Sequence, residues 1–226
     1  MQNSGIEYII KFLPRLLDGF FLTIKISIVA LILSILFGLI IGVIMTSKNK
    51  LINVIMRIFL EAFRLIHPLI WLFIFFFGGT YIFHVQTDGV IVSIIVFTLW
   101  GTFELGDLVR GNITSLPLSQ FESSAALGLT KAQMYIYVLL PQIVLRVTPP
   151  IVNLATRLIK TTTLIFLIGV PEMLKVSQNI IQLVYYNNPH SYISFTMYLF
   201  LLLIYFVICY PLSLFSQYLE KNVSAL

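Results

Sequence analysis

The chain has 226 residues, of which 59% are hydrophobic and only 10% charged, and its formal net charge is +5 at pH 7. Soluble domains carry about 25% charged residues, so this composition excludes a soluble globule. The apolar runs are long and continuous, and a bilayer admits only helices or closed barrels, so we expect an all-α polytopic membrane protein with about five transmembrane helices. Excess Lys and Arg is typical of the cytoplasmic side of such a protein and does not indicate a nucleic-acid partner.

The chain begins with an amphipathic segment, residues 6–18, in which apolar residues recur at helical spacing and Glu7, Lys11 and Asp18 interrupt them. This pattern predicts an N-terminal helix in the membrane interface, with an extension of the first span as the alternative. The first span follows at 19–46. It is far longer than a signal-peptide core of about 7–15 residues, so we expect it to be retained.

The second predicted span, 53–79, carries Arg57, Glu61 and Arg64 in its first half. Glu61 lies at helical spacing from both arginines and could pair with either. The second half is almost wholly apolar and aromatic, which indicates a single hydrophobic crossing.

The third predicted span, 90–110, contains Glu104 and Asp107, three positions apart and therefore on one helix face. A charge inside a membrane costs about 2.5–3.5 kcal/mol on insertion scales, so each carboxylate is a candidate for a substrate path or an ion site. The alternative is that Asp107 pairs with Arg110 at i, i+3.

A polar connection, 114–147, separates the third span from a fourth, 149–170. Pro149-Pro150 suits a helix start, because proline fits the first turn. Arg157, Lys160 and Thr161 then form a hydrophilic stripe, which indicates a water-lined path or side chains that snorkel to the interface.

The fifth predicted span is 191–215, and five spans place the two termini on opposite sides. The cytoplasmic side is the one with more Lys and Arg. That side receives Lys48, Lys50, Arg57, Arg110, Lys131, Arg146 and Lys221, against Lys11, Arg15 and Lys175 on the other. We therefore expect the N-terminus outside, the C-terminus inside, and the polar connection in the cytoplasm.

Motifs for chemistry are missing from the sequence. His67, His84 and His190 are scattered and make no metal-ligand pattern, the lone Cys209 cannot form an internal disulfide, and there is no phosphate-binding loop. The sequence therefore contains no motif that supports an intramembrane enzyme using His67 or the two carboxylates. A secondary transporter or channel with Glu104 and Asp107 as its ion site stays open as the alternative to an ATP-driven system.

The most unusual segment is 120–129, QFESSAALGL, a polar, small-residue stretch in an otherwise apolar chain. It predicts a short, thin helix with Glu122 near its N-terminus, where the helix dipole favours an anion. Gly128 allows a sharp turn after it. Such a helix, projecting from the membrane, suits insertion into a groove on a partner, although an ordinary loop remains the alternative.

This segment resembles the EAA loop of the permease subunits of bacterial ABC importers. Glu122 precedes Gly128 by six positions, and Leu140-Pro141 follows Gly128 at the spacing found in the EAA loop. The two alanines of that motif are Ser123 and Ser124 here, and Val138 replaces an isoleucine.

The flanking motifs are similar to the polar amino acid branch of the same family (His/Gln/Arg/cystine type). They are EAFR at 61–64, DLVRGNI at 107–113, LIKTTTL at 158–164 and GVPE at 169–172. Departures from that branch include the altered second-span motif and Glu104, where the branch often has tyrosine.

The resemblance implies a type I importer permease in the bacterial cytoplasmic (inner) membrane, which is itself no enzyme. Its implied partners are a second permease subunit, identical or paralogous, two cytoplasmic ATPase subunits that bind ATP and Mg, an extracytoplasmic solute-binding protein, a polar amino acid and membrane lipid. It implies no cofactor in this chain. The implied ATPase-coupling residues are Gln120, Phe121, Glu122, Ser123, Ser124, Ala126, Leu127, Gly128, Leu129 and Pro141.

For the substrate path, the sequence offers Arg64, Glu104, Asp107, Arg157, Lys160 and Thr161 as candidates. A carboxylate at Glu104 would favour a cationic amino acid by supplying a buried counter-charge.

Overall fold

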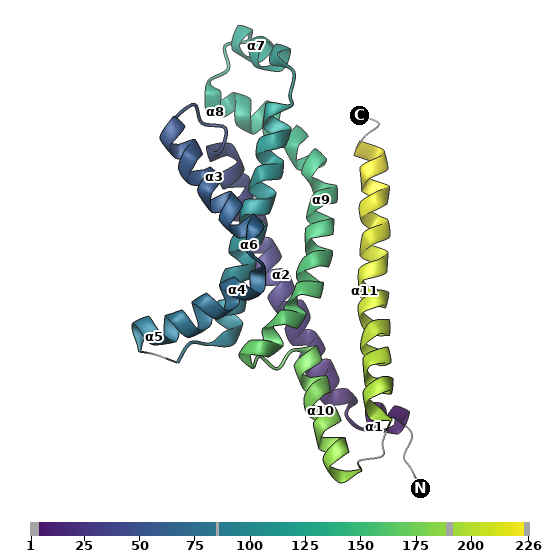
Figure 1. Ribbon diagram of the computed structural model, residues 1–226. Helices are drawn as coiled ribbons and strands as arrows, with labels where there is room; N and C mark the ends of the chain where they lie inside the picture. The colour runs from purple at the N-terminus through teal and green to yellow at the C-terminus, as the bar shows by residue number, and fades with distance from the viewer. Residues whose placement is uncertain (1–4, 85, 189–191, 224–226) are drawn as a thin grey trace.

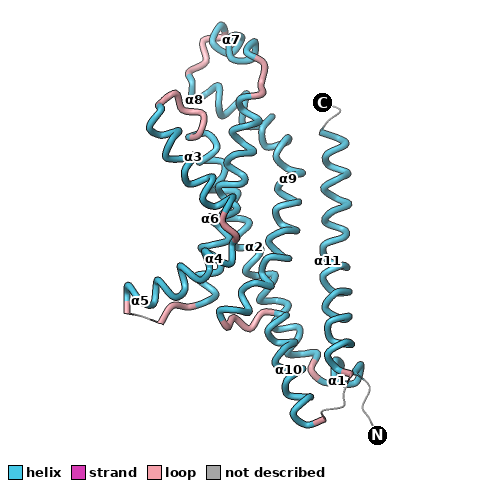
Figure 2. The backbone as a smooth tube through the Cα atoms, viewed as in Figure 1, coloured by secondary structure: helices cyan, strands magenta, loops and turns pink. Residues whose placement is uncertain are grey.

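The computed structural model describes residues 5–84, 86–188 and 192–223, and these residues form helices without any strand (Figures 1 and 2). Four helical runs are long and apolar enough to cross a membrane: Leu13–Ile44, Gly89–Thr114, Lys131–Ile168 and Ile193–Asn222. A fifth crossing is formed if the bent pair Lys50–Leu65 and Pro68–Ile82 is counted as one span. The predicted all-α polytopic class is confirmed.

The centre of the molecule is the pairing of α2 (Leu13–Ile44) with α6 (Gly89–Thr114). Small side chains recur every three or four residues along the buried face of α2: Gly19, Thr23, Ser27, Ala30, Ser34, Gly38 and Gly42. Small residues let two membrane helices approach closely. Ser34 also donates a hydrogen bond of 3.2 Å to the Thr98 carbonyl of α6. This row of small residues holds α6, and with it the charged residues of α6, in a fixed position.

The second span is not the continuous helix predicted at 53–79. α3 (Lys50–Leu65) ends before Pro68, and α4 (Pro68–Phe73) starts again after a bend of 102°. The residue before a proline avoids the helical region, and His67 is extended with ψ 138. α4 continues through the π-helix η1 (Ile74–Gly78) into α5 (Gly79–Phe83), which projects away from the other helices (Figure 1).

The fourth span begins well before the predicted Pro149. One helical run is formed by α8 (Lys131–Gln133), the π-helix η2 (Met134–Leu139) and α9 (Leu140–Thr161). This run contains Pro149 and Pro150 in its interior. Prolines are tolerated in membrane helices where neighbouring groups hold the helix. Here the Pro149 carbonyl accepts a 2.9 Å hydrogen bond from buried Ser216 on α11 (Ile193–Val223). The predicted connection 114–147 therefore shortens to residues 115–130.

The predicted interfacial helix 6–18 is divided between two helices. α1 (Gly5–Lys11) is a separate helix. Residues 13–18 belong to α2, so they form the N-terminal extension of the first span that was the alternative prediction. After α9, the 3₁₀ helix η3 (Thr162–Ile168) and α10 (Met173–Asn187) complete the described part of the chain before α11. Residue 191, the predicted start of the fifth span, and His190 lie outside the described residues; α11 extends to Val223 rather than to residue 215.

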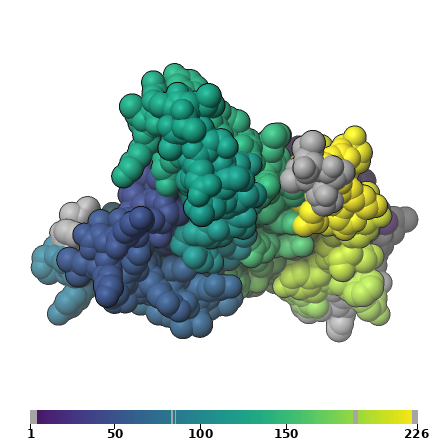
Figure 3. Space-filling model, turned by 90° about the horizontal axis from the view of Figure 1, so that it is seen from above, coloured from purple at the N-terminus to yellow at the C-terminus, as the bar shows by residue number. Residues whose placement is uncertain are grey.

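The two ends of the molecule carry different elements. α1 and α10 lie at the lower end in Figure 1, while α7 (Leu118–Ala126), α8 and the C-terminal part of α11 lie at the upper end. Figure 3 looks at the upper end, where the teal segment that contains α7 covers much of the visible face. The structure thus separates the two groups of basic residues that the sequence assigned to opposite sides of a membrane.

Candidate functional site

The short polar helix predicted at residues 120–126 is present as α7, which starts two residues earlier, at Leu118. One side of α7 faces the protein: Phe121 packs against the main hydrophobic core and Ser124 is buried. The opposite side is exposed and bears Glu122, Ser123 and Leu127, whose exposed fraction is 79%. α7 therefore presents one exposed apolar side chain among polar ones on the side that faces away from the protein.

One side-chain hydrogen bond joins α7 to α9, and two further bonds lie within the elements at its ends. The Gln120 amide donates to the Gln142 side chain on α9 at 3.1 Å. The Gln142 amide in turn donates to the Val138 carbonyl at 2.9 Å, and Ser124 donates to the Gln120 carbonyl at 2.7 Å. The Gln120–Gln142 bond thus connects α7 to α9, one of the spanning helices.

Gly128 ends α7 in the left-handed conformation, with φ 75°. Its N–H donates to the Ala125 carbonyl at 2.9 Å, and the next N–H, that of Leu129, donates to the Ser124 carbonyl at 3.1 Å. These two bonds make a Schellman motif, which favours glycine because other residues pay a steric cost there. Pro141 is the second residue of α9 and directly follows the π-helical segment η2, so it lies inside the continuous run from α8 to α9.

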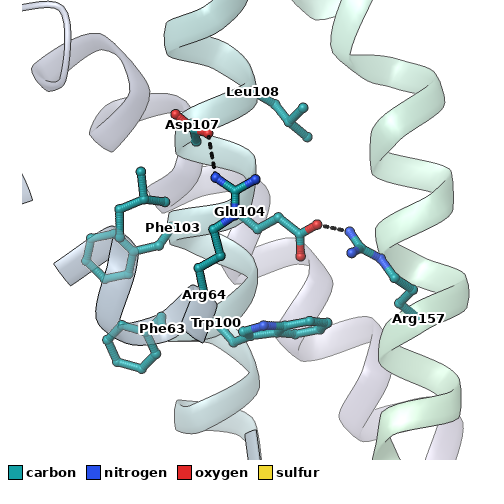
Figure 4. Close-up of a pocket in the computed structure, with 9 residues that line it drawn as sticks. Phe63, Arg64, Trp100, Phe103, Glu104, Asp107, Leu108 and Arg157 are labelled. Atoms are coloured by element: carbon teal, nitrogen blue, oxygen red, sulfur yellow. Dashed lines mark hydrogen bonds and ion pairs between the residues drawn. The ribbon is translucent and has the colours of Figure 1, made fainter. Parts of the chain in front are cut away.

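A second group of predicted residues surrounds a cavity of about 310 Å³ between α3, α6 and α9 (Figure 4). Arg64, Glu104, Asp107 and Arg157 all line it, although they come from three helices. Aromatic side chains form the rest of the wall: Phe63 stacks on Phe103 at 5.2 Å between ring centroids.

Each carboxylate in this cavity contacts an arginine. Glu104 on α6 accepts a hydrogen bond from Arg157 on α9, and the Arg157 guanidinium also lies over the Trp100 ring, 5.6 Å from its centroid. Asp107 Oδ1 accepts from Arg110 Nη2 at 2.7 Å and from Arg110 Nε at 3.0 Å. The predicted Asp107–Arg110 pair is confirmed, and the Glu104 charge is not free to attract a cationic ligand.

Arg64 pairs differently from the prediction. Its Nη1 lies 3.7 Å from Asp107 Oδ2, so its partner is on α6 rather than being Glu61 one turn earlier on α3. The Arg64 side chain is 65% exposed, which leaves its guanidinium accessible from the cavity.

A neighbouring cavity of about 470 Å³ continues along α3. It shares Leu60, Arg64 and Asp107 with the first cavity, and adds Arg57, Glu61 and Arg110. Exposed charges between spanning helices are too costly to face lipid, so this surface is suited to face water or protein.

The structure does not bring the other two candidates, Lys160 and Thr161, into either cavity. Lys160 is exposed on α9. The Thr161 hydroxyl donates a hydrogen bond of 2.8 Å to the Arg157 carbonyl of the same helix. The sequence reading missed Trp100, Phe63 and Phe103. Trp100 stands four positions before Glu104, and that helical spacing is the signal that could have placed it beside the carboxylate.

The described residues contain no cluster of three or more His, Cys, Asp or Glu side chains that could hold a metal ion. Glu104 and Asp107 do share a helix face, but their oxygens are engaged by guanidinium groups, which compete with any cation. Several spanning helices, charged cavities between them and a protruding helix at one end are features that suit a membrane transport protein.

Residues 34–225 match the family described as binding-protein-dependent transport system inner membrane component. The chain belongs to this family and is the membrane-spanning component of such a system. Similar proteins include the "Probable glutamine ABC transporter permease protein GlnP" of Bacillus subtilis (strain 168), 30% identical over 92% of this chain and 93% of the relative. The "Probable amino-acid ABC transporter permease protein YckA" of the same organism is 30% identical over 94% and 91%.

Solved structures support the fold. The crystal structure of an amino acid ABC transporter with histidines has a TM-score of 0.82 at 22% identity, over 98% of this chain and 100% of that chain. An inward-facing structure of the MetNI methionine ABC transporter has a TM-score of 0.65 at 19% identity, over 94% and 98%. Both are ABC transporters that share this helical arrangement.

Proposed function

We propose that this chain is the permease of an ATP-driven importer of polar amino acids, and that α7 is the helix through which ATPase movement enters the membrane. The observation that carries this proposal is the geometry of α7. It projects from one end of the molecule, exposes Glu122 and Leu127, ends on the Gly128 cap, and is bonded to α9 through Gln120. The chain has no phosphate-binding loop, so the energy must come from a partner.

The proposed complex contains two permease subunits, identical or paralogous, and two ATPase subunits that bind ATP and Mg. A solute-binding protein delivers the amino acid on the opposite side. Two of the relatives support this substrate class, because one is described as a glutamine permease and the other as an amino-acid permease. The permease itself performs no hydrolysis in this proposal.

In the proposed orientation, α7 and the C-terminus lie in the cytoplasm and the N-terminus lies outside the bacterial inner membrane. The larger number of basic residues at the α7 end supports it, because Lys and Arg accumulate on the cytoplasmic side. ATP binding would draw the two ATPase subunits together, and α7 would move α9 and the cavity wall between inward- and outward-facing states.

The test is uptake into proteoliposomes that contain the permease, its ATPase and an excess of the binding protein. We expect uptake of a radiolabelled polar amino acid only when ATP and Mg are present on the ATPase side. The competing secondary transporter would give uptake with the permease alone under a sodium or proton gradient. Gradient-driven uptake without the ATPase would refute the proposed function.

A further inference from the structure

The two charged cavities meet at the Arg64–Asp107 ion pair. Leu60, Arg64 and Asp107 line both cavities, and the Arg64 and Asp107 side chains reach across from α3 and α6 (Figure 4). Glu104 and Arg157 lie only in the first cavity, whereas Arg57, Glu61 and Arg110 lie only in the second. Arg64 therefore borders both cavities.

The Arg64 contact is the loosest of the three ion pairs at this site. Its 3.7 Å separation from Asp107 exceeds hydrogen-bond distance. Asp107, in contrast, already accepts two hydrogen bonds from Arg110 at 2.7 and 3.0 Å. Arg157 is held by Glu104 and by the Trp100 ring. Arg64 is therefore the guanidinium in the first cavity whose donors are most available to a ligand.

The cost of releasing Arg64 is low. Asp107 would keep both hydrogen bonds from Arg110, so its charge would stay compensated when Arg64 turns away. Removing the only partner of a charge in a low-dielectric site is expensive, and this arrangement avoids that cost. The planar fork of an arginine also matches a carboxylate with two parallel hydrogen bonds, which a lysine cannot provide.

The charge of the combined site points in the same direction. Its lining contains four arginines and three carboxylates: Arg57, Arg64, Arg110, Arg157, Glu61, Glu104 and Asp107. The positive excess attracts a carboxylate and repels a cationic side chain. Because Glu104 is engaged by Arg157, no carboxylate of the first cavity remains for a ligand's ammonium or guanidinium side chain.

We propose that Arg64 is the carboxylate-binding residue of this path: the carboxylate of the ligand displaces Asp107 from Arg64 at the boundary that the two cavities share. This inference rests on the proposed function and narrows its substrate to neutral or acidic amino acids over arginine and lysine. Arg64 then binds the carboxylate, the positive excess of the lining disfavours a cationic side chain, and Asp107 and Arg110 position Arg64 in the empty state.

The experiment measures binding to the permease–ATPase complex in nanodiscs without the binding protein, so that only the membrane site selects. The probes are radiolabelled L-glutamine, L-glutamate and L-arginine. For the wild type we expect L-glutamine or L-glutamate to bind at least about tenfold more tightly than L-arginine, because the side chain of L-arginine adds a positive charge to a site with an excess of arginines. Tighter binding of L-arginine would overturn the proposal.

The variants Arg64→Gln and Arg64→Lys separate the role of the fork from that of the charge. Both should weaken L-glutamine or L-glutamate binding by about tenfold or more, because neither offers two parallel N–H donors. Arg64→Lys keeps the positive charge beside Asp107, so this variant still tests the proposal if Arg64→Gln fails to assemble. The matched control is Arg146→Gln, which removes an exposed arginine of α9 outside both cavities and should bind as the wild type.

Wild-type affinity in both Arg64 variants would overturn the proposal, as would the failure of the wild-type complex to bind any of the three probes. Neither result would touch the proposed function if the same preparation, with binding protein and ATP added, shows ATP-driven uptake of an amino acid. Absence of that uptake would instead remove the proposed function.

Discussion

Replacing Gly128 by alanine tests whether the cap of α7 transmits force. Gly128 has φ 75°, and a Cβ atom built there would meet no heavy atom within 4 Å. The cost of Gly128→Ala is therefore conformational rather than steric, about 1–2 kcal/mol for an L-residue in the left-handed region. Such a cost lowers the population of the capped end by roughly fivefold to thirtyfold.

Two further variants isolate this effect. Gly128→Asn should be milder, because asparagine tolerates the left-handed region. Gly111→Ala is the matched control: a Cβ at Gly111 also meets no atom within 4 Å, but this residue is helical without a positive φ. There alanine should stabilise the helix by about 0.5–1 kcal/mol.

The assay has two readouts on the same purified complexes. Limited proteolysis of the segment after α7 reports the population of the open cap, and ATP-driven uptake reports transport. We expect cleavage to increase and uptake to fall in the order wild type, Gly128→Asn, Gly128→Ala, with Gly111→Ala like the wild type. Equal cleavage and equal uptake for Gly128→Ala and the wild type would refute the reasoning.

Three other substitutions test the packing and the contact surface. Gly42→Val should destabilise the protein by about 1–3 kcal/mol in a denaturation series, because even a Cβ atom at Gly42 would lie 2.5 Å from the Val109 side chain. An unchanged midpoint would contradict the close α2–α6 packing. Ser216→Ala should cost about 1 kcal/mol through loss of its hydrogen bond to the Pro149 carbonyl, and a shift smaller than the error of the measurement would show that this bond does not hold α9 to α11. Leu127→Glu should leave the melting temperature of the isolated permease unchanged, since this side chain is 79% exposed, but should weaken co-purification with the ATPase by about tenfold; full recovery of the ATPase would argue against α7 as the contact.

The spans could be predicted from the sequence because hydropathy depends on local composition, but their breaks could not all be located. Pro68 breaks the second span and Pro149 does not break the fourth, although the same local rule applies to both. The helix around Pro149 packs against α11, where Ser216 donates to the Pro149 carbonyl, and such a tertiary contact cannot be derived from the local sequence. The start of α10 was also missed. Its N-cap is the buried Glu172, which accepts from the Leu174 and Lys175 N–H groups.

In the candidate site, too, the sequence could identify the residues but not the contacts between them. Intramembrane charge was enough to single out Arg64, Glu104, Asp107 and Arg157, because each is costly in a membrane. Their pairing was not predictable, since Glu104 and Arg157 are 53 positions apart and meet only because α6 packs against α9. Lys160 and Thr161 were included on helical spacing to Arg157, and the structure directs them away from both cavities.

The central claim is that α7 carries the energy of ATP hydrolysis into the membrane. The most direct measurement is the ratio of ATP hydrolysed to amino acid transported, in the same proteoliposomes, for the wild type and for Glu122→Ala on the exposed face of α7. We predict that the variant assembles and hydrolyses ATP at the basal rate while its uptake is lost, so that the ratio rises steeply. A wild-type ratio with wild-type uptake would contradict the account.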